Sequence, residues 1–180
     1  MRIAITGKMR SGKNTVADYF LIHKAFRSMA FGEGIKEVIQ LYFPELLLQG
    51  KPRKLYQAIG QLFREFNPDI WVEILDRRLD QITTWFGDEN IDIVVTDLRQ
   101  ENEYKYLKEQ GFIIIKVEAE DELRIERIKQ SGDTFDHEDF YHETELSVDA
   151  LGFDYLITNN TTIEDLNEQI KFIINEMEEE

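Results

Sequence analysis

The chain opens with MRIAITGKMRSGKNT, residues 1–15, in which an apolar strand runs into a glycine-rich turn. The turn has the spacing Gly7-x-x-x-x-Gly12-Lys13, and a helical pattern follows it. Glycines let the backbone curl so that successive N–H groups face one anion, and the following helix adds the positive end of its dipole. The stretch predicts a phosphate-binding P-loop in which Lys13 reaches the terminal phosphates of a nucleotide. The competing interpretation, a glycine-rich turn with a surface lysine, is disfavoured by the flanking strand and helix.

The residues of this turn are the first candidates for contact with a nucleotide. They are consecutive in the sequence: Gly7, Lys8, Met9, Arg10, Ser11, Gly12, Lys13, Asn14 and Thr15. Asn14 departs from the usual pattern, because a Ser or Thr that ligates Mg²⁺ normally follows the lysine. The amide oxygen of Asn14 can still reach Mg²⁺ through a water molecule, so Asn14 stays a candidate metal contact.

Composition limits the class of protein. The chain has 180 residues, 42% apolar and 32% charged, which fits one soluble globular domain. It has no cysteine, which excludes disulfides and thiolate metal sites. Its net charge of −15 argues against a nucleic-acid or membrane partner. No apolar run is long enough to span a membrane or resembles a signal peptide, so we expect a cytoplasmic protein.

Apolar runs rich in β-forming residues alternate with helical patterns along the chain. The runs cover residues 2–6, 25–31, 91–96, 112–117 and 155–158. Apolar residues at helical spacing predict long helices after Pro68 and near the C-terminus, the latter with Thr161-x-x-Glu164 as a capping box. The alternation predicts an α/β fold with a parallel sheet covered on both faces, whose ligands bind at the carboxyl ends of the strands. The apolar helix faces leave a homodimer open.

Two charged residues follow the central apolar run. Asp97 stands at its end, where an acidic residue in P-loop enzymes holds Mg²⁺ or orients the attacking nucleophile. Arg99 comes two residues later, and its planar guanidinium can grip a phosphate beside the metal. The alternative is that Asp97 only caps the next helix.

A helical segment before Pro68 carries a second polar pattern. Gln57 and Arg64 lie seven residues apart and therefore share a helix face, and Gly60 between them allows close approach. Such a face can read a base edge and hold a monophosphate. The same pattern also fits an amphipathic helix with its polar residues in solvent.

A pair of arginines follows the run 112–117. Arg124 and Arg127 lie three residues apart and so point to one side of a helix. A polar segment over about residues 129–145 comes next and suits a closing lid. Arginines at the base of a lid can neutralise charge on a phosphoryl group in transfer. Neighbouring glutamates could instead pair with them at the surface, and the sequence leaves both interpretations open.

Several motifs, in this order, resemble those of the phage-type deoxynucleoside monophosphate kinases, which share elements with phosphomevalonate kinases. The matching stretches are residues 7–18, Ala30-Phe-Gly-x-x-Ile35-Lys36, Gln57-x-x-Gly60-x-x-x-Arg64, Pro68-Asp-Ile-Trp71, Thr96-Asp-Leu-Arg99-x-x-Asn-Glu103 and Ile157-Thr-Asn-Asn-Thr161. The resemblance implies one P-loop kinase domain over residues 1–180, a three-layer sandwich with five parallel strands. It also implies a helical substrate-binding region over about residues 32–88 and a lid.

The resemblance further implies transfer of the γ-phosphoryl group of ATP to a deoxynucleoside monophosphate, with Mg²⁺ as cofactor. Lys13 would stabilise the transferring group, and Asp97 would assist Mg²⁺. The other implied contacts fall into three sets. The acceptor nucleotide is held by Lys36, Gln57, Arg64, Trp71 and Arg99. The phosphates are closed over by Arg124 and Arg127. The adenine of ATP is lined by Asn159 and Asn160.

Two alternatives remain open at this point. The same fold could phosphorylate a small metabolite, as phosphomevalonate and dephospho-coenzyme A kinases do. An aromatic base-stacking pocket near Trp71 would favour a nucleotide, and a wholly basic pocket would favour phosphomevalonate. The chain could also be a module that binds ATP without phosphorylating a small molecule.

Overall fold

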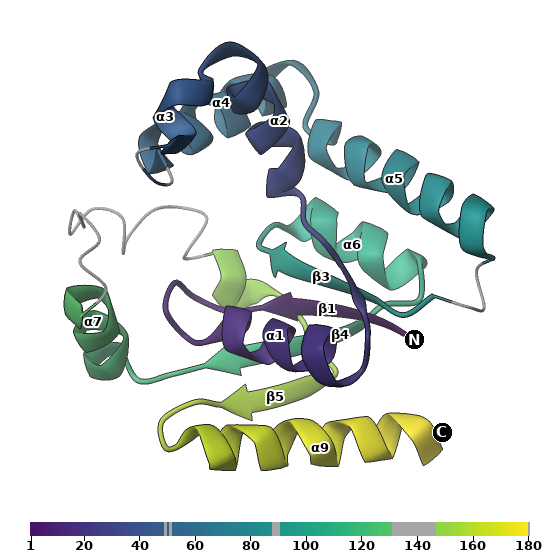
Figure 1. The fold of residues 1–180 in the computed structure, drawn as a ribbon, viewed down its shortest axis with the longest axis vertical. Helices are drawn as coiled ribbons and strands as arrows, with labels where there is room; N and C mark the ends of the chain where they lie inside the picture. Colours follow the sequence, from purple (N-terminus) through teal and green to yellow (C-terminus); the bar gives the residue numbers. More distant parts are fainter. Residues whose placement is uncertain (49, 51, 88–90, 131–146, 180) are drawn as a thin grey trace. The chain divides into compact units, whose positions relative to one another are not determined.

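The computed structural model describes residues 1–48, 50, 52–87, 91–130 and 147–179. The chain forms two compact units, each described by itself (Figure 1). Unit 1 contains Met1–Ser28 and Asp92–Glu180, and unit 2 contains Met29–Ile91. The prediction of one kinase domain stays a prediction. Most of the predicted lid, residues 131–145, lies outside the described residues.

Five strands form one sheet in the order β2-β3-β1-β4-β5. Their bounds are Arg2–Thr6 for β1, Arg27–Met29 for β2, Ile93–Leu98 for β3, Ile113–Glu118 for β4 and Tyr155–Thr158 for β5. β1 pairs in parallel with β3 on one side and with β4 on the other, and β5 pairs in parallel with β4. This sheet confirms the predicted α/β fold with five parallel strands.

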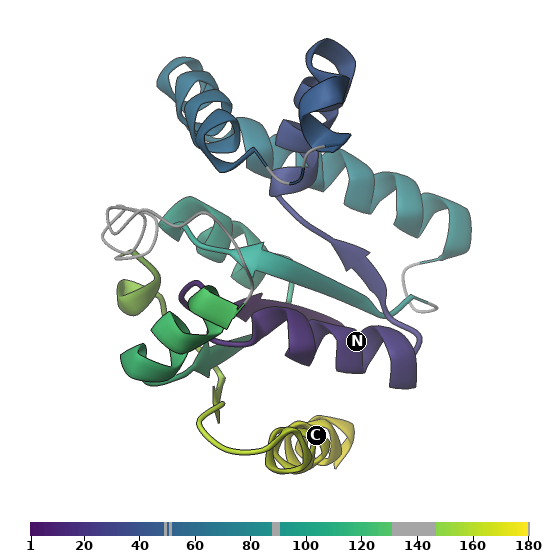
Figure 2. The same ribbon diagram turned by 60° about the vertical axis from the view of Figure 1, so that its left-hand side comes forward.

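The central strands are apolar because helices cover both faces of the sheet. Ile3, Ala4 and Ile5 of β1 are fully buried, as are Ile93 and Val94 of β3. Figure 2 shows α1 (Lys13–His23) in front of the sheet and α6 (Glu101–Glu109) behind it. These buried strands fix the sheet edge from which the P-loop leaves β1.

Two further helices lie in the described part of unit 1. α7 (Asp121–Gln130) follows β4, and α9 (Ile163–Glu179) follows β5, with a short 3₁₀ turn, η3 (Ser147–Ala150), before β5. Phe20 of α1 belongs to the same hydrophobic cluster as Ile170 of α9, so both helices cover one face of the sheet. No helix in the described part of the chain is both long and apolar enough to cross a membrane.

Unit 2 consists of α2 (Gly32–Tyr42), α3 (Pro44–Leu48), α4 (Arg53–Phe66) and α5 (Ile70–Phe86). Trp71 at the start of α5 contacts both α4 and α2. Its indole N–H donates to the carbonyl of Gly60 in α4 at 3.2 Å, and its ring lies against Gly34 of α2. Only 2% of its surface is exposed, so Trp71 is part of the packing of unit 2.

Two strand boundaries differ from the prediction. The run predicted over residues 25–31 forms only the short β2: Ala25 before it has a φ of +57°, which a strand does not accommodate, and Phe31 after it already has helical angles. The run predicted over residues 91–96 forms β3 from Ile93 to Leu98, so Asp97 lies within the strand. Thr6 stabilises this extension, because its hydroxyl donates to the Leu98 carbonyl at 2.9 Å.

The predicted capping box of the last helix was wrong by one residue. The hydroxyl of Thr162 accepts a hydrogen bond from the Asp165 N–H at 3.2 Å, and the Asp165 carboxylate accepts one from the Thr162 N–H. Hydrogen bonds from Thr161 and Thr162 lower the pKa of the Asp165 carboxyl. Both Thr161-x-x-Glu164 and Thr162-x-x-Asp165 have the spacing of a capping box, and the hydrogen bonds form in the second.

The packing of α9 can be tested with a matched pair of substitutions. Ile170→Ala removes a fully buried side chain and should lower the free energy of unfolding by about 2–5 kcal/mol. Phe172→Ala, on the same helix at a residue that is 62% exposed, should cost much less. Urea unfolding followed by circular dichroism measures both values, and equal losses would contradict this packing.

Candidate active site

The P-loop connects β1 to α1 with the backbone geometry that its glycines allow. Gly7 has a φ of +148° and Gly12 a φ of +105°. A Cβ at Gly12 would overlap the side-chain amide of Asn159, and one at Gly7 would overlap the Val117 carbonyl. Both positions therefore need glycine for conformation and for space. Arg10 also has a positive φ, +62°, which places a non-glycine residue in the left-handed region.

Lys13, the first residue of α1, points back into this loop. It is 8% exposed, and its ammonium donates to the Gly7 carbonyl at 2.5 Å and to the Lys8 carbonyl at 2.7 Å. The Lys8 carbonyl also accepts the Ser11 N–H at 3.2 Å, which closes a turn within the loop. Lys13 thus bonds the loop that follows β1, and its predicted contact with phosphate remains a prediction.

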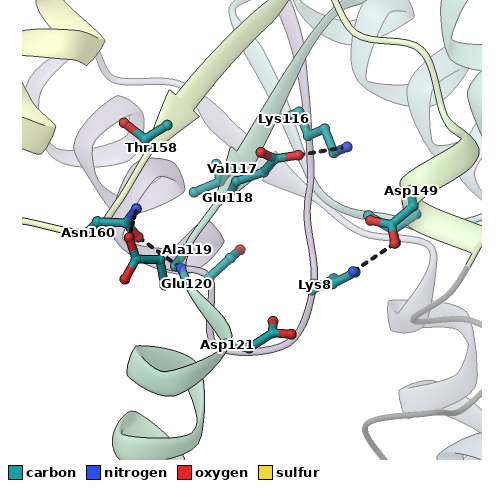
Figure 3. A pocket seen from close by; sticks show the side chains of 12 residues that line it. Lys8, Lys116, Val117, Glu118, Ala119, Glu120, Asp121, Asp149, Thr158 and Asn160 are labelled. Atoms are coloured by element: carbon teal, nitrogen blue, oxygen red, sulfur yellow. Dashed lines mark hydrogen bonds and ion pairs between the residues drawn. The ribbon is translucent and has the colours of Figure 1, made fainter.

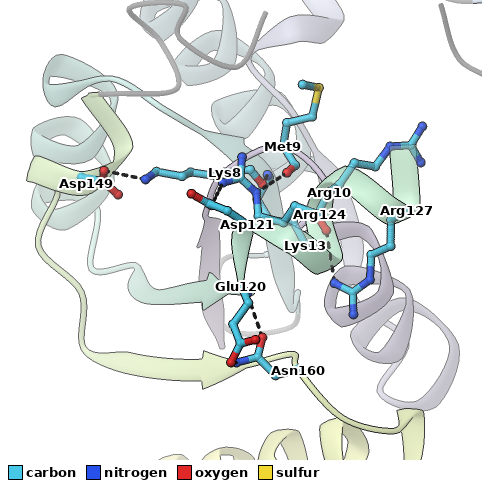
Figure 4. Close-up of polar contacts among 10 residues, drawn as sticks. All are labelled: Lys8, Met9, Arg10, Lys13, Glu120, Asp121, Arg124, Arg127, Asp149 and Asn160. Atoms are coloured by element: carbon cyan, nitrogen blue, oxygen red, sulfur yellow. Dashed lines mark hydrogen bonds and ion pairs between the residues drawn. The ribbon is translucent and has the colours of Figure 1, made fainter. Parts of the chain in front are cut away.

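Two arginines of α7 contact the next carbonyls of the loop (Figure 4). Arg124 Nε donates to the Met9 carbonyl at 2.8 Å, and Arg124 Nη1 pairs with Asp121 at 2.6 Å. Arg127 donates to the Arg10 carbonyl at 3.2 Å. The sequence left open whether these arginines meet phosphates or pair with neighbouring glutamates. In the structure both bind the backbone of the P-loop.

Asn159, directly after β5, contacts the same loop. Its side-chain amide donates to the Ser11 carbonyl at 2.8 Å, while its own carbonyl accepts from Arg127 at 2.8 Å. Asn160 turns to the loop before α7, where its Oδ1 accepts the Glu120 N–H at 2.9 Å. The predicted contact of these two residues with adenine remains a prediction.

The carboxyl end of β3 carries the predicted pair Asp97 and Arg99, both of them partly buried. The Arg99 N–H donates to the Glu103 carboxylate at 2.9 Å, and the Arg99 carbonyl accepts the Ser147 hydroxyl at 2.9 Å. Glu103 is only 3% exposed and also accepts the N–H of Gln100 at 3.0 Å. The backbone of Arg99 is therefore fixed on both sides, and Glu103 is a supporting residue whose role the sequence argument did not identify.

The metal prediction rests on Asn14 and Asp97. Asn14 lies exposed in the first turn of α1, and Asp97 lies near the end of β3. No cluster of three or more His, Asp or Glu side chains in the described part of the chain could hold a metal ion. When phosphates and water fill the remaining positions, Mg²⁺ needs only one or two protein ligands. Their contact with Mg²⁺ stays a prediction.

A pocket of about 330 Å³ borders the P-loop within unit 1 (Figure 3). Lys8 and Ser11 line it from the loop, and Lys116 and Glu118 line it from β4. Lys8 pairs with Asp149 at 2.7 Å, and Lys116, only 7% exposed, pairs with Glu118 at 2.9 Å. The Ser11 hydroxyl is buried and has no hydrogen-bond partner among the described residues. Lys116 was missed by sequence reasoning, because a lysine in an apolar strand carries no motif.

The other predicted acceptor residues lie in unit 2. Lys36 is exposed on α2, and Gln57 and Arg64 are partly buried on α4. Trp71 is buried, and the ring of Phe63 stacks on it with centroids 5.4 Å apart. Phe63 remains 38% exposed, so the accessible aromatic ring beside Trp71 is that of Phe63. The predicted roles of these residues remain predictions.

The requirement for glycine in the P-loop gives a direct test. Gly12→Ala should weaken the binding of ADP by more than about tenfold, because the new methyl group displaces the Asn159 amide and the φ of +105° disfavours an L-residue. Gly111→Ala is the control, since Gly111 also has a positive φ, +75°, but open space around it. It should lower stability by about 1 kcal/mol without changing ADP affinity. Isothermal titration calorimetry measures both affinities, and normal ADP binding by Gly12→Ala would contradict the loop geometry.

Comparison with known proteins finds a family and a relative. A family model described as AAA domain matches residues 3–146. Uncharacterized protein ORF76 of Ictalurid herpesvirus 1 is 27% identical over 110 residues, which cover 61% of this chain and 44% of the viral protein. The chain thus spans less than half of the length of that relative.

Two solved structures share the fold at low sequence identity. Shikimate kinase from Bacteroides thetaiotaomicron matches with a TM-score of 0.56 and 13% identity, over 99% of this chain and 98% of that one. Dephospho-CoA kinase from Campylobacter jejuni matches with a TM-score of 0.55 and 14% identity, over 98% of this chain and 96% of that one. The fold is therefore that of the P-loop kinases. With a family model that matches most of its length and contains the whole P-loop, the chain belongs to the AAA domain family.

Proposed function

We propose that the protein is an ATP-dependent kinase of small molecules, and that its acceptor is a deoxynucleoside monophosphate. The observation that carries the proposal is the P-loop itself, in which Lys13 bonds the first two carbonyls and side chains from outside the loop, Arg124 and Asn159, bond those of Met9 and Ser11. Peptide N–H groups on the inner side of such a loop, together with a lysine, bind the phosphates of a nucleoside triphosphate.

The residues fit ATP with Mg²⁺. The two glycines leave a cradle that side chains would fill, and the Lys13 ammonium lies in the loop, bonded to the Gly7 and Lys8 carbonyls. Asn14 and Asp97 are the residues that would contact the metal. Bound Mg²⁺ would neutralise negative charge that develops on the phosphates during transfer.

Phosphoryl transfer from ATP to the acceptor does not require a covalent intermediate on the protein. An oxygen of the acceptor phosphate attacks the γ-phosphorus of ATP, and the bond from that phosphorus to the β,γ-bridging oxygen breaks, which gives ADP and a diphosphate. Lys13 would stabilise the negative charge on the transferring phosphoryl group, and Arg99 would hold the acceptor phosphate. Positioning and charge stabilisation then account for catalysis.

A deoxynucleotide acceptor is supported by the residues on α4. Arg53, Gln57 and Arg64 recur at intervals of four and seven residues and so share one face of the helix. The partly exposed ring of Phe63 lies on the same helix and offers a surface on which a base can stack. Cationic, amide and aromatic groups together suit a phosphate with an attached base better than a purely anionic metabolite.

A coupled assay of ADP release tests the acceptor class. Deoxynucleoside monophosphates, nucleoside monophosphates, phosphomevalonate and dephospho-coenzyme A are offered in turn with Mg-ATP. We expect turnover with at least one deoxynucleoside monophosphate. Turnover with only a non-nucleotide acceptor would contradict the proposed deoxynucleotide acceptor. No ADP release with any acceptor would favour an ATP-binding module without kinase activity.

Substitution of the P-loop lysine tests the chemistry. Lys13→Ala should reduce kcat by at least about 10²-fold, because the transferring phosphoryl loses its charged donor. The fold should persist, which circular dichroism checks. Lys171→Ala, at an exposed lysine of α9, is the control and should leave the rate unchanged. Near-normal phosphoryl transfer by Lys13→Ala would contradict the proposed kinase function.

A second pair of variants tests the acceptor face. Arg64→Gln should raise the KM for the deoxynucleoside monophosphate by about tenfold and leave the KM for ATP unchanged, because it removes a cation from the acceptor side only. Arg77→Gln, at an exposed arginine of α5, is the matched control. Equal changes in both KM values for Arg64→Gln would count against a role in acceptor binding.

A further inference from the structure

Each backbone carbonyl of the P-loop from Gly7 to Gly12 accepts a hydrogen bond. Lys13 donates to the carbonyls of Gly7 and Lys8, and the N–H of Val16 in α1 donates to that of Gly12. The three carbonyls between them receive side chains from outside the loop. These donors, in order, are Arg124 for Met9, Arg127 for Arg10 and Asn159 for Ser11. The middle of the loop is therefore held by α7 and by the segment after β5.

We propose that Arg124 is a positioning residue, which holds the P-loop in its phosphate-binding conformation through the Met9 carbonyl and does not contact the transferred phosphoryl group. The inference rests on the proposed function only in assuming that this loop binds the phosphates of a nucleotide. It replaces the catalytic role that the sequence predicted for Arg124.

Burial and anchoring of the side chain support this role. Arg124 is only 2% exposed, and its guanidinium is held at two points, by the Met9 carbonyl at 2.8 Å and by Asp121 at 2.6 Å. Hydrogen bonds with a charged partner are about twice as strong as neutral ones. Release of the guanidinium from the loop would require the loss of both contacts.

The hydrogen bond from Arg124 to the Met9 carbonyl also sets the direction in which the Arg10 N–H points. A peptide bond is planar, and its C=O and the following N–H point in opposite directions. When Arg124 draws the Met9 carbonyl toward α7 (Figure 4), the Arg10 N–H is directed away from α7. A loop binds an anion through N–H groups that face it, so the direction of this donor bears on the proposed phosphate site.

The backbone at Arg10 needs such support. Its φ of +62° is unfavourable for an L-residue with a side chain, by about 1–2 kcal/mol. Residues keep such conformations only where the surroundings hold them. The carbonyl before Arg10 is bonded to Arg124 and the carbonyl of Arg10 itself to Arg127, so α7 fixes the peptides on both sides of the strained residue.

Binding of ADP and of pyrophosphate by calorimetry tests the proposal without any acceptor. Arg124→Lys keeps the positive charge but lacks the planar guanidinium that bonds Met9 and Asp121 together. We expect both ligands to bind about tenfold more weakly, because the loss is in the phosphate site. Glu122→Gln, at an exposed residue of the same helix, is the control and should bind both ligands as the unmodified protein does.

A second variant covers the case in which Arg124→Lys does not fold, which its melting temperature will show. Asp121 is 70% exposed, so Asp121→Asn keeps the core intact while it releases one of the two anchors. It should weaken ADP and pyrophosphate about two- to threefold. If the folded variants bind both ligands normally, the proposal is overturned.

Kinetics separate the two roles of an arginine near a phosphate. An arginine that stabilises the transition state would leave ADP affinity unchanged and lower kcat by about 10³-fold or more when replaced. A positioning arginine raises the KM for ATP and leaves kcat within a few-fold. The first pattern would overturn the proposal. Silence of the acceptor panel would remove the proposed kinase function, whereas the ADP and pyrophosphate affinities would still decide the role of Arg124.

Discussion

The hydrogen bonding of the P-loop carbonyls is the interaction on which the candidate site depends. A loop that binds an anion must present N–H groups inward, and each peptide plane can do so only if its carbonyl points outward and finds a donor there. Arg124, Arg127 and Asn159 supply such donors to the three middle carbonyls from side chains outside the loop. The site is thus formed by the polar groups around the loop as much as by the loop itself.

These donors come from distant parts of the sequence, and the sheet brings them together. Arg124 lies 115 residues after Met9, and Asn159 lies 148 residues after Ser11. They meet because β4 pairs with β1 and β5 pairs with β4, all in parallel, so that the carboxyl ends of the three strands share one edge. The apolar cluster that holds α1 and α9 on the sheet fixes the position of that edge, which links the stability of unit 1 to the geometry of the site.

The acidic character of the chain does not extend evenly to the loop. The net charge is −15, yet three of the residues from Lys8 to Lys13 are basic and α7 adds two arginines beside them. Two carboxylates that line the pocket beside the loop are paired with cations, Asp149 with Lys8 and Asp121 with Arg124. Paired carboxylates repel an incoming polyanion less than free ones do, so a triphosphate can approach an acidic protein at this point.

The sequence by itself determined the local and periodic features of this protein. The strand, the glycine spacing and the helix of residues 1–23 follow from local sterics, and apolar periodicity gave the α/β class with its parallel sheet. Only the tertiary structure decided where polar side chains with several available partners would point. Arg124 and Asn159 turned to loop carbonyls, Trp71 became buried beneath Phe63, and Thr162 rather than Thr161 formed the capping box. The physical reason is that a hydrogen bond or a ring contact is selected by neighbours that are distant in sequence, and a motif names the residue without naming its neighbours.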